Sequence, residues 1–300
     1  MLKIALSDLY CHPLPENHRF PMEKYELLPR QLVHEGTVKD ENFFTPTTLA
    51  DEQILAVHTS EYLDKLRSLS LTKKEERRTG FPLSDRLVER EINIAAGTIQ
   101  CADYALEHGV AMNIAGGTHH AYSDRGEGFC LLNDQAIASR YLLDTGKCSQ
   151  VLIIDLDVHQ GNGTAKIFSH EPKVFTFSMH GESNYPMHKE QSDLDVGLAD
   201  GCEDQFYLST LEANLNNIIE SINPDFLFYQ SGVDVLATDK LGRLGLSIEG
   251  CKARDKMVLK TAYELKIPIV VSMGGGYSEN IKHIIEAHAN TFRLAQEMFF

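Results

Sequence analysis

Short apolar runs alternate with longer amphipathic stretches along most of this chain, and this alternation restricts its fold. The expected strands are Lys3–Ser7, Val110–Ala115, Val151–Asp155, Val174–Ser178, Phe226–Ser231 and Ile267–Met273. The expected helices are Asp51–Ser68, Ser84–His108, Asp134–Thr145, Asp204–Ile222, Ser247–Leu265 and Asn280–Phe300. Strands separated by helices form βα units, so the pattern predicts an α/β fold with a mostly parallel sheet and helices on both faces.

No internal repeat and no Pro/Gly/Ser-rich linker interrupts this alternation. An α/β chain of 300 residues can fold as one unit. We therefore expect residues 1–300 to form a single domain. The most polar stretch, Thr72 to Arg78, is expected to be a solvated loop or helix end.

Five of the expected strands are followed directly by polar or glycine-rich segments. These segments are Gly116–His120, Asp155–His159, Ser178–His180, Ser231–Asp234 and Gly274–Tyr277. The carboxyl ends of parallel strands share one edge of a sheet, and ligands bind at that edge. The sequence therefore predicts a functional site there.

Asp155, Asp157 and His159 follow a buried strand at two-residue spacing, so an extended chain would point all three the same way. Two carboxylates and an imidazole are costly to bury as bare charges. A divalent metal offsets that cost, and mixed oxygen and nitrogen ligands suit zinc. Taken alone, the segment is also compatible with a polar cap on a core strand.

Charge and cysteine usage limit the possible functions. The net charge of −15 argues against general nucleic-acid binding and favours cationic ligands, lysine-like ones included. Six cysteines without a Cys-x-x-Cys pair indicate free thiols in a reducing compartment, so we expect a cytoplasmic location. The first residues are too short for a signal peptide, and no apolar run is long enough to span a membrane.

Several segments resemble, in order, the motifs of the zinc-dependent histone deacetylase family. They are Gly116–His120, Gly126–Asn133, Asp155–Gly163, Ser178–His180, Gly232–Asp234 and Gly274–Tyr277. His18–Tyr25 and His159–Gly163 further resemble the class IV branch and its bacterial relatives. The resemblance implies a three-layer fold of the arginase/deacetylase type. It also implies one zinc ion per chain, held by Asp157, His159 and Asp234.

The same resemblance implies the catalytic groups. His120 is expected to act as general base and acid, His119 to assist it while paired to Asp155, and Tyr277 to donate a hydrogen bond to the oxyanion. Asn162 stands where many members of the family have an aspartate partner for the second histidine. An amide orients an imidazole but cannot stabilise imidazolium by charge, so we expect His120 to be less basic than in an Asp-paired relative.

Substrate and cation sites are implied in the same way. The expected substrate channel consists of Phe129 and Tyr185 as facing walls, together with Leu241, Gly128, Gly275 and Arg19. Arg19 resembles the arginine that lines the internal acetate exit in the family. The resemblance also implies potassium, bound by Asp155, Ser178 and the carbonyls of Asp157, His159 and Met179, with Phe168 and Val174 at a second site.

The leading hypothesis is a zinc amidohydrolase that removes acetyl or longer fatty acyl groups from lysine in a protein or peptide, or from a small lysine-like amine. An arginase-like dinuclear amidinohydrolase is a second reading; neutral Gln160, Gly161 and Asn162 favour one metal instead. A catalytically silent acyl-amine binder is the third, and the complete set of catalytic residues disfavours it.

Overall fold

The computed structural model describes all residues from 1 to 300 and contains a single eight-stranded sheet. The strand order is β2-β1-β3-β8-β7-β4-β5-β6, and every neighbouring pair is parallel. The strands are β1 Lys3–Ala5, β2 Phe43–Phe44, β3 Val110–Asn113, β4 Val151–Asp155, β5 Val174–Gly181, β6 Leu194–Leu198, β7 Phe226–Gln230 and β8 Ile269–Ser272. The predicted sheet is confirmed, and it is entirely parallel.

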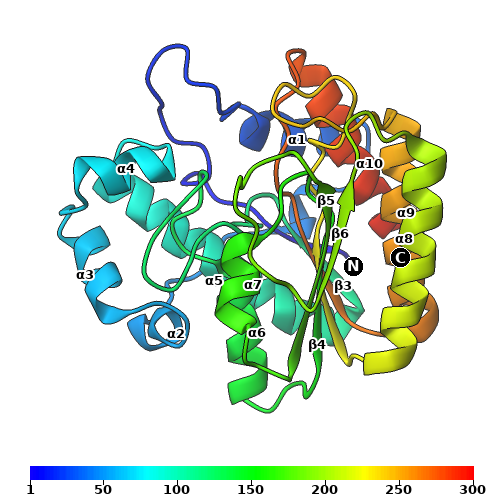
Figure 1. Ribbon diagram of the computed structural model, residues 1–300, viewed down its shortest axis with the longest axis horizontal. Coiled ribbons are helices and arrows are strands. Elements are labelled where there is room, and N and C mark those ends of the chain that lie inside the picture. Colours follow the sequence, from blue (N-terminus) through cyan, green and yellow to red (C-terminus); the bar gives the residue numbers. More distant parts are fainter.

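Helices cover both faces of this sheet and complete three layers (Figure 1). They are α1 Lys24–His34, α2 Asp51–Leu55, α3 Ser60–Arg67, α4 Lys73–Thr79, α5 Asp85–His108, α6 Asp134–Asp144, α7 Asn162–Phe168, α8 Asp204–Ile222, α9 Ile248–Leu265 and α10 Ile281–Phe299, with a 3₁₀ turn at Asp40–Asn42. Helices α5 to α7 lie on one face, while α8 to α10 lie on the other and α1 packs against α10. No helix is long and apolar enough to cross a membrane.

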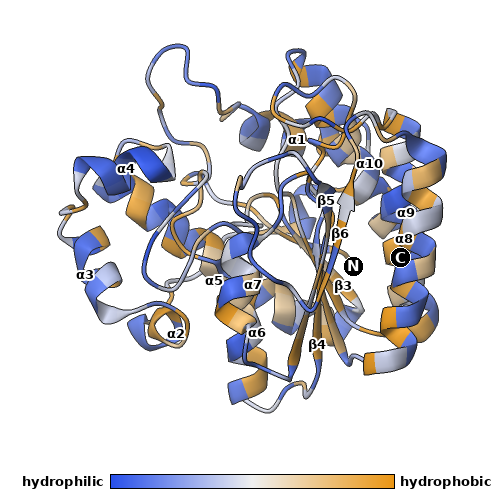
Figure 2. Ribbon diagram, in the orientation of Figure 1, coloured by the Kyte–Doolittle hydropathy of each residue, from blue (hydrophilic) through white to orange (hydrophobic).

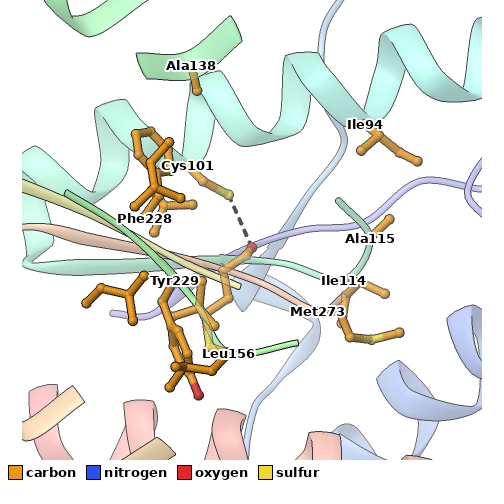
Figure 3. Close-up of a cluster of buried hydrophobic side chains, with 14 of the residues drawn as sticks. Ile94, Cys101, Ile114, Ala115, Ala138, Leu156, Phe228, Tyr229 and Met273 are labelled. Carbon is orange, nitrogen blue, oxygen red and sulfur yellow. Dashed lines mark hydrogen bonds between the residues drawn. The ribbon is translucent and has the colours of Figure 1, made fainter. Parts of the chain in front are cut away.

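The central strands are buried on both sides, which explains their nearly continuous apolar sequences. Every residue of β4 and β7 is buried. Apolar strands occupy the interior, and hydrophilic residues cover the outer faces of the helices (Figure 2). Successive residues of β7 point to opposite layers: Phe228 faces α5, and Tyr229 faces the other way (Figure 3). The Tyr229 hydroxyl there bonds to Asp255 of α9, so this polar group is paired within the core.

Some predicted boundaries were wrong for identifiable local reasons. The helix expected over Asp51–Ser68 is two helices, because Thr59 adopts extended backbone and its hydroxyl caps α3 by accepting from Tyr62 N. The stretch from Thr72 to Arg78 folds largely as α4, with a reciprocal capping box between Thr72 and Glu75. Helices α1 and α7 and strands β2 and β6 were not predicted.

Candidate active site and metal centre

Asp157, His159 and Asp234 form a buried group beyond the carboxyl ends of β4 and β7. One ligand atom from each lies within 4.8 Å of the others. His159 Nδ1 is 3.1 Å from Asp157 Oδ1 and 3.2 Å from Asp234 Oδ2. Three potential ligand atoms therefore lie close together, as the binding of one cation requires.

Backbone amides hold the two carboxylates in place. The amide of Gly275 donates to Asp157 Oδ2 at 2.8 Å, and the amide of Val158 donates to Asp234 Oδ1 at 2.9 Å. A Cβ atom at Gly275 would lie 2.0 Å from Asp234 Oδ2, so only glycine permits this approach. Gly275 was predicted as part of the substrate channel; its backbone also holds a metal-binding candidate.

The charges of this group fit a divalent metal. Asp157 is 1% exposed and Asp234 is fully buried. Burial and the neighbouring Asp157 carboxylate raise the pKa of Asp234 to about 7. Two buried carboxylates repel each other, and a cation between them relieves both the repulsion and the loss of hydration. Two oxygens and one imidazole nitrogen suit zinc.

Asp155 lies outside this triad, contrary to the two-residue pattern. Strand β4 ends at Asp155, so the alternation of an extended chain does not continue to Asp157 and His159. Asp155 Oδ2 lies instead 2.7 Å from His119 Nδ1. Burial alone would lower the pKa of His119, but the Asp155 and Asp157 carboxylates raise it to about 9.

His120 lies beside His119, with 4.1 Å between the ring centroids, and has a different partner. His120 Nδ1 is 2.6 Å from Asn162 Oδ1. Burial, together with the neighbouring histidines, lowers the pKa of His120 well below its ordinary value. Asn162 begins α7, and its amide nitrogen donates to the Tyr122 hydroxyl at 3.0 Å. This bond orients the Asn162 oxygen toward His120; Tyr122 carried no recognisable signal in the sequence.

Tyr277 follows the glycine-rich segment after β8, and its ring centroid lies 6.5 Å from that of His159. Its backbone amide donates to Asp239 Oδ2 at 2.6 Å. Burial raises the pKa of the Tyr277 hydroxyl well above its ordinary value, so the hydroxyl keeps its proton. Asp239 was not predicted to have a role, although it also accepts bonds from the amides of Leu241 and Gly242.

A pocket opens above this group, and most of the predicted channel residues line it. The lining comprises Arg19, Arg77, Arg78, His120, Gly128, Phe129, His159, Tyr185, Leu241 and Tyr277. The Tyr185 ring stands edge-on to His120, with centroids 5.1 Å apart. Gly128 has φ +54°, and a Cβ there would meet the His120 ring at 2.6 Å. Phe129 and Tyr185 thus lie at the pocket that leads to the triad.

Arg19 does not line an internal exit. It is exposed, and its guanidinium carbon lies 4.9 Å from the Phe129 ring centroid in the outer pocket. The inner cavity behind the histidines instead contains Arg90, which is buried and paired with Glu91. Arg19 precedes α1 in a surface loop, whereas Arg90 lies on the buried face of α5.

Of the residues predicted for potassium, Asp155 lies against His119. Asp155 and Ser178 are direct neighbours in the pairing of β4 with β5, which also carries Met179. Asp157 and His159 are buried residues, and no backbone amide donates to their carbonyl oxygens. Phe168 ends α7 and Val174 begins β5 nearby along the chain.

Comparisons with known proteins show which family this chain resembles. A histone deacetylase domain model matches residues 18–292. An uncharacterized protein of Picosynechococcus sp. is 42% identical over 290 residues, covering 97% of each chain. Histone deacetylase 2 of Arabidopsis thaliana is 30% identical, covering 93% of this chain and 74% of that protein.

Solved structures have the same fold. The crystal structure of an HDAC homolog complexed with SAHA superposes with a TM-score of 0.85 at 25% identity, covering 99% of this chain and 84% of that one. Fold and site together define an α/β protein of the arginase/deacetylase type. The chain belongs to the histone deacetylase family. Membership supports an amidohydrolase of the deacetylase kind.

Proposed function

We propose that this protein is a zinc-dependent deacylase acting on the side-chain amine of lysine or of a lysine-like small molecule. The observation that carries the proposal is the buried Asp157, His159 and Asp234 group beside the His119–His120 pair, at the base of an aromatic pocket. Family membership supports the reaction class. We further propose that residues 1–300 act as one catalytic domain.

Asp157, His159 and Asp234 would hold one zinc ion. When bound, zinc supplies Lewis acidity, which makes water more acidic and amide carbonyls more electrophilic. The neutral residues Gln160 and Asn162 after the histidine supply no bridging carboxylate, which favours one metal over the two of an arginase-like amidinohydrolase.

The chain's own groups move the protons in this proposal. His120 takes a proton from the water while the water oxygen bonds to the acyl carbon. Tyr277 donates a hydrogen bond to the oxyanion that forms. A histidine of the pair then protonates the amine nitrogen as the carbon–nitrogen bond breaks. Asn162 and Asp155 act as positioning residues. The Asn162 side-chain oxygen contacts Nδ1 of His120, and the Asp155 carboxylate contacts Nδ1 of His119.

The Phe129 and Tyr185 rings would enclose the thin alkyl stem of an acyl-lysine, with Leu241 beside them. We propose potassium at Asp155 and Ser178 because the nearby carbonyls of Asp157 and His159 lack hydrogen-bond donors, and a monovalent cation would satisfy them. Phe168 and Val174 would serve a second site. The cytoplasmic location stays a prediction from the scattered free cysteines.

The deciding experiment offers acetyl-, decanoyl- and myristoyl-lysine peptides to purified zinc-loaded protein, with Tyr277→Phe as the control. Turnover lost in that variant supports the proposal, and the best substrate gives the acyl preference. Zinc binding without turnover on any peptide would identify a silent acyl-amine binder. Two metals per chain would favour the dinuclear hydrolase.

A further inference from the structure

The arginines of this acidic protein differ in whether they form ion pairs with carboxylates. Eight of the twelve lie within 4.0 Å of a carboxylate, namely Arg30, Arg67, Arg90, Arg125, Arg140, Arg243, Arg254 and Arg293. Arg86 donates to the backbone carbonyls of Asp8 and Cys11. The other three, Arg19, Arg77 and Arg78, all line the pocket above the candidate metal centre. A chain with 43 acidic and 28 basic residues thus keeps its unpaired guanidiniums at one place.

The carboxylates near this place are already engaged elsewhere. Glu75 pairs with Lys65 and accepts from Thr72 in the cap of α4. Glu76 accepts from the amide of Leu83 at 2.9 Å. Glu127 contacts the Tyr185 hydroxyl and lies 3.6 Å from Arg125. Arg78 also lines a neighbouring pocket with Glu61 and Asp124, but Glu61 pairs with Lys65 and Asp124 pairs with Arg125. No carboxylate lies within 4.0 Å of the three arginines, which therefore form a positive rim on the pocket.

The backbone beneath this rim is fixed to the channel wall. The amide of Gly128 donates to the Arg78 carbonyl at 3.1 Å, and the amide of Phe129 donates to the Thr79 carbonyl at 2.6 Å. Arg19 rests on the Phe129 ring, and Arg77 uses its Nε to donate to Lys73 O. The rim is therefore anchored at its base, while the terminal guanidinium nitrogens remain available.

We propose that Arg19, Arg77 and Arg78 select acyl-lysine substrates that carry a carboxylate beside the acylated side chain. This inference rests on the proposed deacylase function and names its substrate class. The planar guanidinium fork matches a carboxylate, and a cleft lined by one sign of charge concentrates oppositely charged ligands. The carboxylate is either the free α-carboxylate of the acyl-lysine itself or an acidic side chain next to it.

Two pairs of acyl-lysine peptides separate these sources. One pair has glutamate or glutamine on either side of an internal acyl-lysine; the other ends in acyl-lysine as the free acid or the amide. We expect kcat/KM at least five-fold higher for the charged member of one or both pairs, through a lower KM. Raising the salt concentration should reduce that ratio, because these charges are exposed. Equal rates within both pairs would overturn the proposal.

The variant Arg19→Gln/Arg77→Gln/Arg78→Gln should bring both ratios within two-fold. Arg30→Gln is the matched control: this exposed arginine of α1 pairs only with Glu26, and its removal should leave the ratios intact. A preference that survives in the triple variant would show that the rim does not cause it.

Binding gives a readout that does not depend on turnover. Fluorescence anisotropy with labelled peptides on the Tyr277→Phe protein should show the same preference for the carboxylate and its loss with the three arginines. Failure of every peptide to react would refute the deacylase, whereas equal binding of charged and neutral peptides would refute the rim. The melting temperatures of the triple variant and of Arg30→Gln are measured first, so that a loss of stability is not mistaken for a loss of binding.

Discussion

The Nδ1 atom of His120 lies 2.6 Å from the side-chain oxygen of Asn162, a neutral partner for a buried imidazole. The neighbouring His119 faces the carboxylate of Asp155 at 2.7 Å. Two adjacent histidines thus have partners of different charge. This difference separates their proton affinities, and it is the basis of the first prediction.

Replacing Asn162 by aspartate places a negative charge against His120, which raises the pKa of that imidazole. A base that holds its proton to higher pH becomes active only at higher pH. We expect the acid limb of the kcat/KM profile of Asn162→Asp to move upward by about one pH unit. An acid limb that stays where it is in the wild type would refute the assignment of His120 as the base.

Replacing Tyr277 by phenylalanine removes the proposed donor to the oxyanion without changing the ring. We expect kcat to fall by about 10²–10³-fold. KM should change by less than two-fold, because the hydroxyl acts mainly in the transition state. Steady-state kinetics with an acetyl-lysine reporter measure both constants. Bound zinc should equal that of the wild type, and a loss of zinc would assign Tyr277 a structural role instead.

Replacing Asp234 by asparagine removes one of the three converging ligands and should abolish stable zinc binding. After dialysis, elemental analysis should find about one zinc per chain in the wild type and little in Asp234→Asn. Adding zinc should raise the melting temperature of the wild type alone. Asp200→Asn, which alters an exposed carboxylate paired with Arg243, serves as the control and should retain the metal.

The pH dependence of stability can be predicted from Glu35, which follows α1. Arg293 of α10 donates to both of its oxygens, at 2.6 and 2.8 Å, and lowers the pKa of Glu35 to about 2. A lowered folded-state pKa adds stability above the ordinary value of 4.5, and that stability is lost as the pH falls toward 2. Solvent screening limits the effect to about 1 kcal/mol.

Glu35→Gln should therefore be less stable than the wild type at pH 7, and the difference should shrink as the pH falls from 4.5 toward 2. Urea denaturation at several pH values measures this difference. Glu26→Gln, which breaks the exposed pair with Arg30, should show no comparable trend. A difference between Glu35→Gln and the wild type that is constant with pH would contradict the ion-pair explanation.

Much of the architecture could be predicted because its signals are local. Apolar runs bounded by polar residues located six of the eight strands, including β4 and β7, which are buried along their whole length. Strand β2 has two residues and β6 is a partly exposed edge strand, so neither has a continuous apolar pattern. Helix α4 was missed because its seven residues are nearly all polar, and its capping box alone identifies it.

Contacts between distant segments explain the rest. The pairing of His119 with Asp155 was expected from family resemblance. The bond that the Tyr277 amide donates to Asp239 spans 38 residues and had no signal in the sequence. Arg19 was assigned to the wrong side of the pocket, because its position along the chain does not show which way the loop before α1 turns. The convergence of the arginine rim likewise depends on how α4 packs, and the sequence order of its residues does not show it.

The position of β8 makes the candidate site depend on a segment near the end of the chain. This strand, near the end of the chain, lies between β3 and β7 and is the link between two halves of the sheet. The half with β3 carries the paired histidines, and the half with β4 and β7 carries the three candidate ligands. Residues 269–272 must therefore be in place before the two sets of groups can adopt this arrangement, and a chain that ends before β8 lacks the strand that joins the paired histidines to the three candidate ligands.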